Sequence, residues 1–201
     1  MNHLLTVIVT VYNKRPFLSD CFESLLSAFR TCTDLEFVIV DDCSTDRSFD
    51  TILDILKCED IYVTYVSSLH NMGASFAKNL GASLAGGEYL LFVDADDQIV
   101  PSEASGILQV LRNRYRPDLL TFDYKVLVCG SSTDVSVFGK SCGIDGSNLI
   151  LVTNELYRAL AVKWNLLGAS IIKREVFDNQ GGFNERFART DDVDWFRKLF
   201  A

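Results

Sequence analysis

The sequence contains few of the residues that zinc sites and disulfide frameworks need. Its 201 residues include two histidines and six cysteines, and no two cysteines stand in C-x-x-C spacing. A zinc site of the common kinds is therefore not expected. The six cysteines instead predict reduced structural thiols in a cytosolic protein, because stable disulfides are rare in that compartment.

Long apolar runs and an excess of basic residues are missing as well. The longest apolar run, Leu4 to Tyr12, is interrupted by Thr6 and Thr10 and falls far short of the ~20 residues that cross a bilayer. Met1 to Leu5 carries no basic n-region, so no signal peptide is expected. We expect a soluble cytoplasmic protein, and peripheral contact with the inner face of the cell membrane stays open. The formal net charge of −8 argues against a nucleic-acid partner, which requires a basic face.

Three common motifs of nucleotide-binding and hydrolytic enzymes are absent. No G-x-G-x-x-G follows the first apolar run, and the chain contains neither G-x-x-x-x-G-K-[ST] nor G-x-S-x-G. These absences argue against a Rossmann dinucleotide enzyme, a P-loop phosphotransferase and an α/β-hydrolase. A nucleotide site in this chain would use carboxylates and a metal in place of a glycine cradle.

The first hundred residues alternate short β-branched runs with amphipathic helical segments. Strands are predicted at 5–11, 35–40, 61–66 and 89–93, and helices at 16–30, 49–56 and 74–85. This alternation predicts an α/β fold with a mostly parallel, Rossmann-like sheet flanked by helices.

The second half of the chain has a less regular pattern. Helices are predicted at 102–113, 153–162 and 191–200, a strand at 168–172, and one longer strand or two at 118–128. The polar stretch 131–147 gives no assignment. Because no internal repeat or linker is visible, we expect residues 1–201 to form a single domain.

Two acidic loops follow predicted strands. Asp41 and Asp42 follow the second strand, and Asp94, Asp96 and Asp97 follow the fourth. The carboxyl ends of parallel strands lie on one edge of a sheet, where open α/β folds bind ligands. The Asp94-x-Asp96 spacing suits a hard divalent cation that phosphate oxygens also coordinate; the alternative is a solvated acidic turn. We expect Asp42 to accept a hydrogen bond from the imide N–H of a base, and Asp41 to brace its loop.

The chain resembles the family 2 glycosyltransferases, which have the GT-A fold and use nucleotide sugars. The matching segments are Val7–Asn13, Val38–Asp46, Asn71–Asn79 and Gly87–Asp97. The resemblance covers residues 4–101 and resumes weakly at 168–199. It implies a GT-A-type fold with a nucleotide-sugar-binding half at 1–101 and a smaller acceptor-side half at 102–201. Family members usually continue further, so we expect the chain to be truncated at its C-terminus.

The resemblance implies a role for each matching residue of the nucleotide site. The residues expected to line the base and ribose are Thr10, Tyr12 and Asn13. Asp42 is expected to hold the base, and Lys78 stands near the base and diphosphate, where the family usually has arginine. Lysine keeps the charge but lacks the planar fork of arginine.

The resemblance also implies a metal site and shows one departure from the family pattern. Asp94 and Asp96 form the family's D-x-D element, and Asp96 is expected to be the direct ligand of Mg²⁺ or Mn²⁺. Cys43 replaces the usual glycine of a D-D-G-S segment, so this turn must tolerate a side chain.

An inverting transfer needs a carboxylate that removes the proton of the acceptor hydroxyl. The segment Gly181–Asp192 resembles the family's glycine-Phe-x-Glu stretch with its acidic pair, which implies that Asp192 is the base and Asp191 its support. The alternative is that Asp191 is an ordinary carboxylate at a helix N-terminus, favoured by the helix dipole. Trp195 is a candidate to stack on an acceptor sugar, and its alternative is a place in the core.

These features predict an inverting, metal-dependent glycosyltransferase. It would move a sugar from a nucleoside diphosphate sugar, preferentially a UDP-sugar, to a hydroxyl of a glycan or lipid-linked saccharide. The resemblance alone implies that the product belongs to bacterial surface polysaccharide synthesis. The alternative is a non-catalytic module that binds a nucleotide sugar or a partner chain. Such a module would have lost the D-x-D element or the base, and both are present. A nucleotidyltransferase is not favoured, because residues 10–15 lack a glycine-rich and basic pyrophosphate loop.

Overall fold

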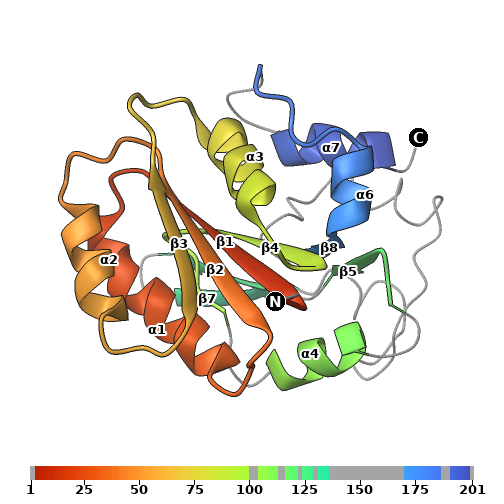
Figure 1. Cartoon of the computed structure of the whole chain (residues 1–201), viewed down its shortest axis with the longest axis horizontal. Helices are drawn as coiled ribbons and strands as arrows, with labels where there is room; N and C mark the ends of the chain where they lie inside the picture. Colours follow the sequence, from red (N-terminus) through yellow and green to blue (C-terminus); the bar gives the residue numbers. More distant parts are fainter. Residues whose placement is uncertain are drawn as a thin grey trace.

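The fold is a central sheet with helices on both faces. The computed structural model describes residues 3–99, 104–112, 116–121, 124–128, 131–135, 170–186 and 191–199. The sheet has the order β3-β2-β1-β4-β8-β5. Its strands, in chain order, are β1 (Leu5–Val11), β2 (Leu35–Asp41), β3 (Tyr62–Ser67), β4 (Tyr89–Asp94), β5 (Leu119–Thr121) and β8 (Ser170–Lys173). Strands β1 to β4 are parallel, whereas β8 runs antiparallel to β4 and β5, which confirms the predicted α/β fold with a mostly parallel sheet (Figure 1).

Helices form a separate layer on each face of this sheet (Figure 1). One layer contains α1 (Leu18–Phe29), α2 (Ser48–Leu56) and α4 (Ala104–Arg112), and the 3-10 helix η1 (Arg15–Phe17) leads into α1. The opposite layer contains α3 (Ala74–Leu84), α6 (Arg174–Asn179) and α7 (Asp191–Leu199). A second sheet pairs β6 (Tyr124–Val128) with β7 (Ser131–Val135). No helix in the described ranges is long and apolar enough to cross a membrane.

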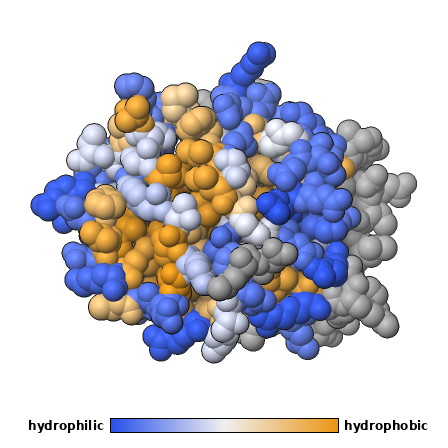
Figure 2. Space-filling view, viewed as in Figure 1, coloured by the Kyte–Doolittle hydropathy of each residue, from blue (hydrophilic) through white to orange (hydrophobic). Residues whose placement is uncertain are grey.

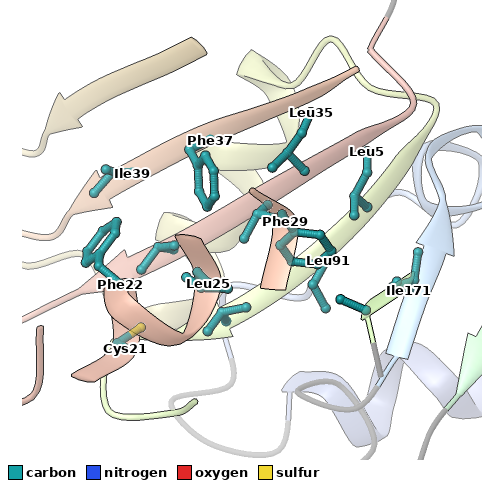
Figure 3. Packing of buried hydrophobic residues seen from close by; sticks show 14 of the residues in the cluster. Leu5, Cys21, Phe22, Leu25, Phe29, Leu35, Phe37, Ile39, Leu91 and Ile171 are labelled. Atoms are coloured by element: carbon teal, nitrogen blue, oxygen red, sulfur yellow. The ribbon is translucent and has the colours of Figure 1, made fainter. Parts of the chain in front are cut away.

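Both faces of the sheet are buried because side chains alternate along each strand. Val7 and Val9 of β1 belong to the apolar cluster that also contains side chains of α1 and α4. Ile8, between them, belongs to the cluster formed with α3, α6 and α7. Figure 3 shows the first cluster, with side chains of α1 packed against those of the sheet. Strands buried on both faces explain why β1, β2 and β4 are nearly continuous apolar runs.

Aromatic rings attach the C-terminal helices to the sheet. Phe92 of β4 lies with its ring centroid 5.3 Å from that of Phe177 in α6 and 5.2 Å from that of Phe183. Trp195 of α7 stacks on Phe177 with a centroid separation of 5.7 Å and is fully buried. Its core interpretation is confirmed, and the alternative that Trp195 stacks on an acceptor sugar is wrong, because no face of the ring reaches the surface.

The structure adds elements that the sequence pattern did not predict. Strand β7 lies in the stretch without an assignment. The stretch 118–128 divides into β5 and β6, which confirms the two-strand alternative, and these strands belong to different sheets. Helix α6 was not predicted because six residues are too few for a helical apolar period to be recognised. The predicted helix at 153–162 lies outside the described residues.

One side of the molecule exposes apolar side chains (Figure 2). Phe49 and Leu53 of α2 occupy apolar positions in the predicted helical pattern, yet they are 46% and 56% exposed. Tyr62 and Val63 of β3, the edge strand on this side, are also exposed. Among the large apolar side chains of α2, only that of Ile52 is buried.

Helix α3 lies close to the sheet because residue 81 has no side chain. A Cβ atom at Gly81 would lie 2.4 Å from Cγ2 of Ile8 and 3.3 Å from Cγ2 of Val40. Ile8 is fully buried and β-branched, so its side chain cannot turn away. Gly106, inside α4, differs in this respect, because a Cβ atom there would meet nothing within 4 Å.

We expect alanine at these two helical glycines to have opposite effects on stability. Gly106→Ala gains helix propensity without a clash and should raise the free energy of unfolding by about 0.5–1 kcal/mol. Gly81→Ala gains the same propensity but overpacks the core, and it should lower the free energy of unfolding by about 1–3 kcal/mol. Urea unfolding followed by circular dichroism measures both. Equal stabilisation by the two variants would contradict the close packing of α3.

Candidate active site

The two acidic loops meet at one edge of the sheet. Strand β1 lies between β2 and β4, with Val11 in register with Asp41 and Thr10 in register with Asp94. The backbone continues this pairing beyond the strands, because the N–H of Asp42 donates to the carbonyl of Val11 at 2.8 Å. The predicted common edge for both acidic loops is therefore confirmed, since their strands flank the same neighbour.

Asp94 is held by groups from β1 and α3. The hydroxyl of Thr10 donates to Oδ1 of Asp94 at 2.9 Å, and Nζ of Lys78 lies 3.4 Å from the same oxygen. Lys78 is only 7% exposed, so its ammonium is a nearly fixed positive charge beside the acidic loop. Thr10 and Lys78, both predicted site residues, thus converge on a member of the D-x-D element.

The rest of the acidic loop carries a strong negative field. Burial, followed by the charges of Asp94 and Asp96, raises the pKa of Asp97 to about 6. Asp96 forms an ion pair with Lys14, from the loop after β1, with 2.5 Å between Nζ and Oδ2. The side chains of Lys14 and Asp96 are 37% and 38% exposed, so this ion pair lies at the mouth of the site.

The carboxylates fit a divalent cation that has further ligands from elsewhere. Within the described part of the chain, no group of three or more His, Cys, Asp or Glu side chains is arranged to hold a metal ion alone. Mg²⁺ and Mn²⁺ in nucleotide sites commonly take one or two protein carboxylates and complete their shells with phosphate oxygens and water. Asp94 and Asp96 can supply such a pair, because both side chains reach solvent.

Asp41 and Asp42 both stabilise loops through their carboxylates. Asp41 accepts hydrogen bonds from the N–H of Ser44 and the hydroxyl of Tyr65, each at 2.8 Å, as expected for a bracing residue. Asp42 accepts the N–H groups of Met72 at 2.8 Å and Gly73 at 2.7 Å, one on each oxygen. Asp42 is only 4% exposed and positions the loop that precedes α3, a role that was not predicted.

Asn13 joins the first two loops of the site. Its backbone N–H donates to the hydroxyl of Ser44 at 2.9 Å, and its Oδ1 accepts the N–H of Thr45 at 2.8 Å. Asn13 adopts a left-handed backbone conformation with φ of 53°, which asparagine tolerates well. Tyr12, the preceding residue, is 47% exposed at the end of β1, where a planar ligand can reach its ring.

The turn at Cys43 has the conformation that favours glycine. Cys43 has φ of 67°, in the left-handed region that costs a residue with a Cβ atom roughly 1–2 kcal/mol. The thiol lies 3.5 Å from the carbonyl oxygen of Leu69. The turn therefore keeps a glycine-type geometry despite the side chain.

The segment that precedes the expected catalytic pair lies beside α3. Asp191 and Asp192 are the first two residues of α7, and their side chains lie outside what the structure describes. The preceding segment is attached to α3 by Asn79, whose Oδ1 accepts the N–H of Phe183 and whose Nδ2 donates to its carbonyl, both at 2.9 Å. An open polar pocket of about 480 Å³ lies here, lined by Asn79, Gln180, Gly181, Gly182, Phe183, Asn184, Glu185, Arg186 and Lys198.

Sequence reasoning missed two residues that organise this region, Lys14 and Asn79. Lys14 has a signal in the sequence, because its positive charge follows the first strand and acidic residues follow the second and fourth strands. Asn79 lies in a matching segment, but its partners are 104 residues away, and spacing alone does not identify such partners.

The chain is similar in sequence to bacterial glycosyltransferases. The family model described as Glycosyl transferase family 2 matches residues 6–125, more than half of the chain. An uncharacterised glycosyltransferase of Haemophilus influenzae is 27% identical over 199 residues, covering 98% of this chain and 62% of the relative. The poly(ribitol-phosphate) beta-glucosyltransferase of Bacillus spizizenii is 34% identical over 95 residues, covering 47% of this chain and 15% of the relative. The chain spans less than two thirds of the length of the curated relatives it matches.

Solved structures share the fold. The chain matches Staphylococcus aureus TarS 1-349 in complex with UDP-GlcNAc with a TM-score of 0.79 and 25% identity, over 98% of this chain and 53% of the TarS 1-349 chain. It matches the mannosyltransferase PcManGT of Pyrobaculum calidifontis, in complex with GDP-Man and Mn²⁺, with a TM-score of 0.68 and 18% identity, over 97% of this chain and 51% of that protein. These likenesses confirm the predicted GT-A-type fold, and together with the family match they lead to one conclusion. The chain belongs to glycosyl transferase family 2.

Proposed function

We propose that the chain carries the donor site of an inverting, metal-dependent glycosyltransferase that uses a nucleoside diphosphate sugar. One observation carries the proposal: the D-x-D carboxylates and Asp42 lie on one sheet edge, with Lys78 fixed beside Asp94. A cationic side chain and a bound metal beside each other provide the two positive charges that a diphosphate needs. A UDP-sugar is the preferred donor, supported by the TarS complex with UDP-GlcNAc.

The acceptor proposed is a hydroxyl of a glycan or a lipid-linked saccharide. The relative named poly(ribitol-phosphate) beta-glucosyltransferase supports a cell-surface polymer. Residues 1–101 would form the donor half and residues 102–201 the acceptor-side half. The pocket beside Asn79 belongs to this second half and is lined by amides and charged side chains suited to sugar hydroxyls.

Asp96 and Asp94 would hold Mg²⁺ or Mn²⁺. The Mn²⁺ in the PcManGT complex supports this choice of ion in a protein of the same fold. When bound, the metal would stabilise the negative charge that develops on the leaving diphosphate. Thr10 restrains Asp94 through its hydroxyl, and Lys78 adds a positive charge that needs no reorganisation, because it is already buried in place.

The remaining donor contacts follow from the loop arrangement. Tyr12 presents an exposed ring on which a base can stack, and Asn13 keeps the two neighbouring loops together. Asp42 accepts one backbone N–H on each oxygen, and a carboxylate oxygen has a second lone pair for the imide N–H of a uracil. Its loop contacts would keep that carboxylate oriented toward the base.

Asp192 would act as the general base, with Asp191 as its support. Asp192 is the second residue of α7, and a helix dipole in general favours the ionised form of a carboxylate in the first turn. In that form it can accept the proton of the acceptor hydroxyl as the oxygen attacks the anomeric carbon from the side opposite the diphosphate. That direction of attack inverts the configuration.

We expect Asp96→Ala to lose metal-dependent binding of UDP. Removing a metal ligand should weaken UDP binding in the presence of Mn²⁺ by about tenfold or more. Isothermal titration calorimetry of UDP with saturating Mn²⁺ measures the effect. The matched control is Asp54→Ala, which removes an exposed aspartate of α2 whose partner is Lys57 and should bind UDP normally. Equal affinity in the Asp96→Ala and wild-type proteins would contradict the metal assignment.

Asp192→Asn should keep donor binding and lose turnover. Without the base, release of UDP from a UDP-sugar in the presence of Mn²⁺ should fall by about 10²-fold or more, with the affinity for UDP unchanged. Asp194→Asn, two residues along the same helix, is the control and should retain turnover. Near-normal turnover of Asp192→Asn would place the base elsewhere. Donor binding without any UDP release by the wild-type protein would favour the non-catalytic module.

A further inference from the structure

The ion pair between Lys14 and Asp96 involves the carboxylate that is proposed to bind the metal. Lys14 belongs to the loop after β1 and Asp96 to the loop after β4, 82 residues later in the chain. Nζ of Lys14 lies 2.5 Å from Oδ2 of Asp96. The ammonium of Lys14 therefore lies beside Asp96 on the exposed side of the site.

The ammonium of Lys14 and a divalent ion would compete for the carboxylate of Asp96. Mg²⁺ binds a carboxylate oxygen at about 2.1 Å, so a metal on this carboxylate would lie close to the ammonium. The two cations also repel each other at such separations. Binding of the metal at Asp96 would therefore weaken the ion pair and favour the departure of Lys14.

We propose that Lys14 is an internal counter-ion that neutralises Asp96 until the metal arrives, and that it competes with the metal for this carboxylate. The inference rests on the proposed metal site and adds that Lys14 competes with the metal for the carboxylate of Asp96. Its consequence is that the metal binds weakly alone and more tightly with the donor, because diphosphate oxygens then supply ligands that offset the loss of the ion pair.

The second lysine at the site differs from Lys14 in the property that displacement requires. Lys78 is 7% exposed and its Nζ is 3.4 Å from Asp94, so it cannot withdraw without exposing the packed surface of α3. Lys14 is 37% exposed, and its Nζ also lies 5.7 Å from the ring centroid of Phe17, itself half exposed. An exposed aromatic ring offers the displaced ammonium a second, weaker partner. Lys14 is thus the movable cation and Lys78 the fixed one.

The experiment measures Mn²⁺ binding to the full chain without nucleotide. Electron paramagnetic resonance reports free Mn²⁺ directly, so the measurement does not depend on turnover. Lys14→Met removes the competitor and keeps the length of the side chain. Since exposed ion pairs are worth about 0.2–1 kcal/mol, the variant should bind Mn²⁺ up to about fivefold more tightly than the wild type. In an Asp96→Asn background, Lys14→Met should give no gain.

Arg15→Met is the matched control for the loss of one positive charge. Arg15 is the next residue and the first of η1. Its described hydrogen bond runs from its backbone N–H to Asp46, so the substitution leaves that contact in place. At 0.15 M salt, the effect of an exposed charge falls off over about 8 Å, so a charge without contact to Asp96 acts on it less strongly than one that forms an ion pair with it. Arg15→Met should therefore change the affinity for Mn²⁺ less than Lys14→Met does. Circular dichroism melts verify that each variant is folded.

Two results would overturn the proposal while leaving the proposed function intact. In the first, Lys14→Met and Arg15→Met raise the affinity for Mn²⁺ equally, which would show a general effect of charge. In the second, Lys14→Met leaves the affinity unchanged although Asp96→Asn lowers it, which would show that Lys14 does not compete. If Asp96→Asn itself has no effect on Mn²⁺ binding, the metal site lies elsewhere, and both the counter-ion and the proposed metal role of Asp96 fail.

Discussion

The register of β1 between β2 and β4 is the constraint on which the site depends. Parallel pairing on both sides of β1 brings Asp41 and Asp94 to the level of its last residues. Sequence separation then has no influence on how close the acidic loops lie, because hydrogen-bond ladders fix their positions. The buried apolar runs that flank the ladders on both faces keep this edge rigid, and the polar groups at the edge are thereby preorganised.

The acidic edge is stabilised by positive charges and backbone donors that come from other loops. Asp41 and Asp42 are satisfied by hydrogen-bond donors, and Asp94 and Asp96 each lie beside a lysine. The remaining carboxyl, Asp97, has a raised pKa, because burial and two neighbouring anions both disfavour its ionised form. The site therefore has two parts. The carboxylates of Asp41 and Asp42 accept hydrogen bonds that shape the loops, and the acidic loop after β4 has a negative charge that favours a cation.

Periodicity predicted the first half of the fold because strands buried on both faces and helices with one apolar face have distinct patterns. The acidic loops were also visible, since their carboxylates directly follow these strands. The contacts of Asp42 with Met72 and Gly73 were not, because they depend on how a loop folds back over the sheet edge. The same limit applies to Asn79 and Phe183, whose hydrogen bonds join elements far apart in the sequence.

The close approach of α3 to the sheet has a consequence for natural variation. Gly81 lies three residues after Lys78, and both are buried on the sheet-facing side of the helix. The spacing between helix and sheet thus sets how long a side chain must be to reach Asp94 from position 78. A larger residue at position 81 would move the backbone of α3 away from the sheet. The cationic side chain at position 78 would then have to be longer to reach Asp94, and arginine is longer than lysine. Homologues that diverge at these two positions are therefore expected to do so together.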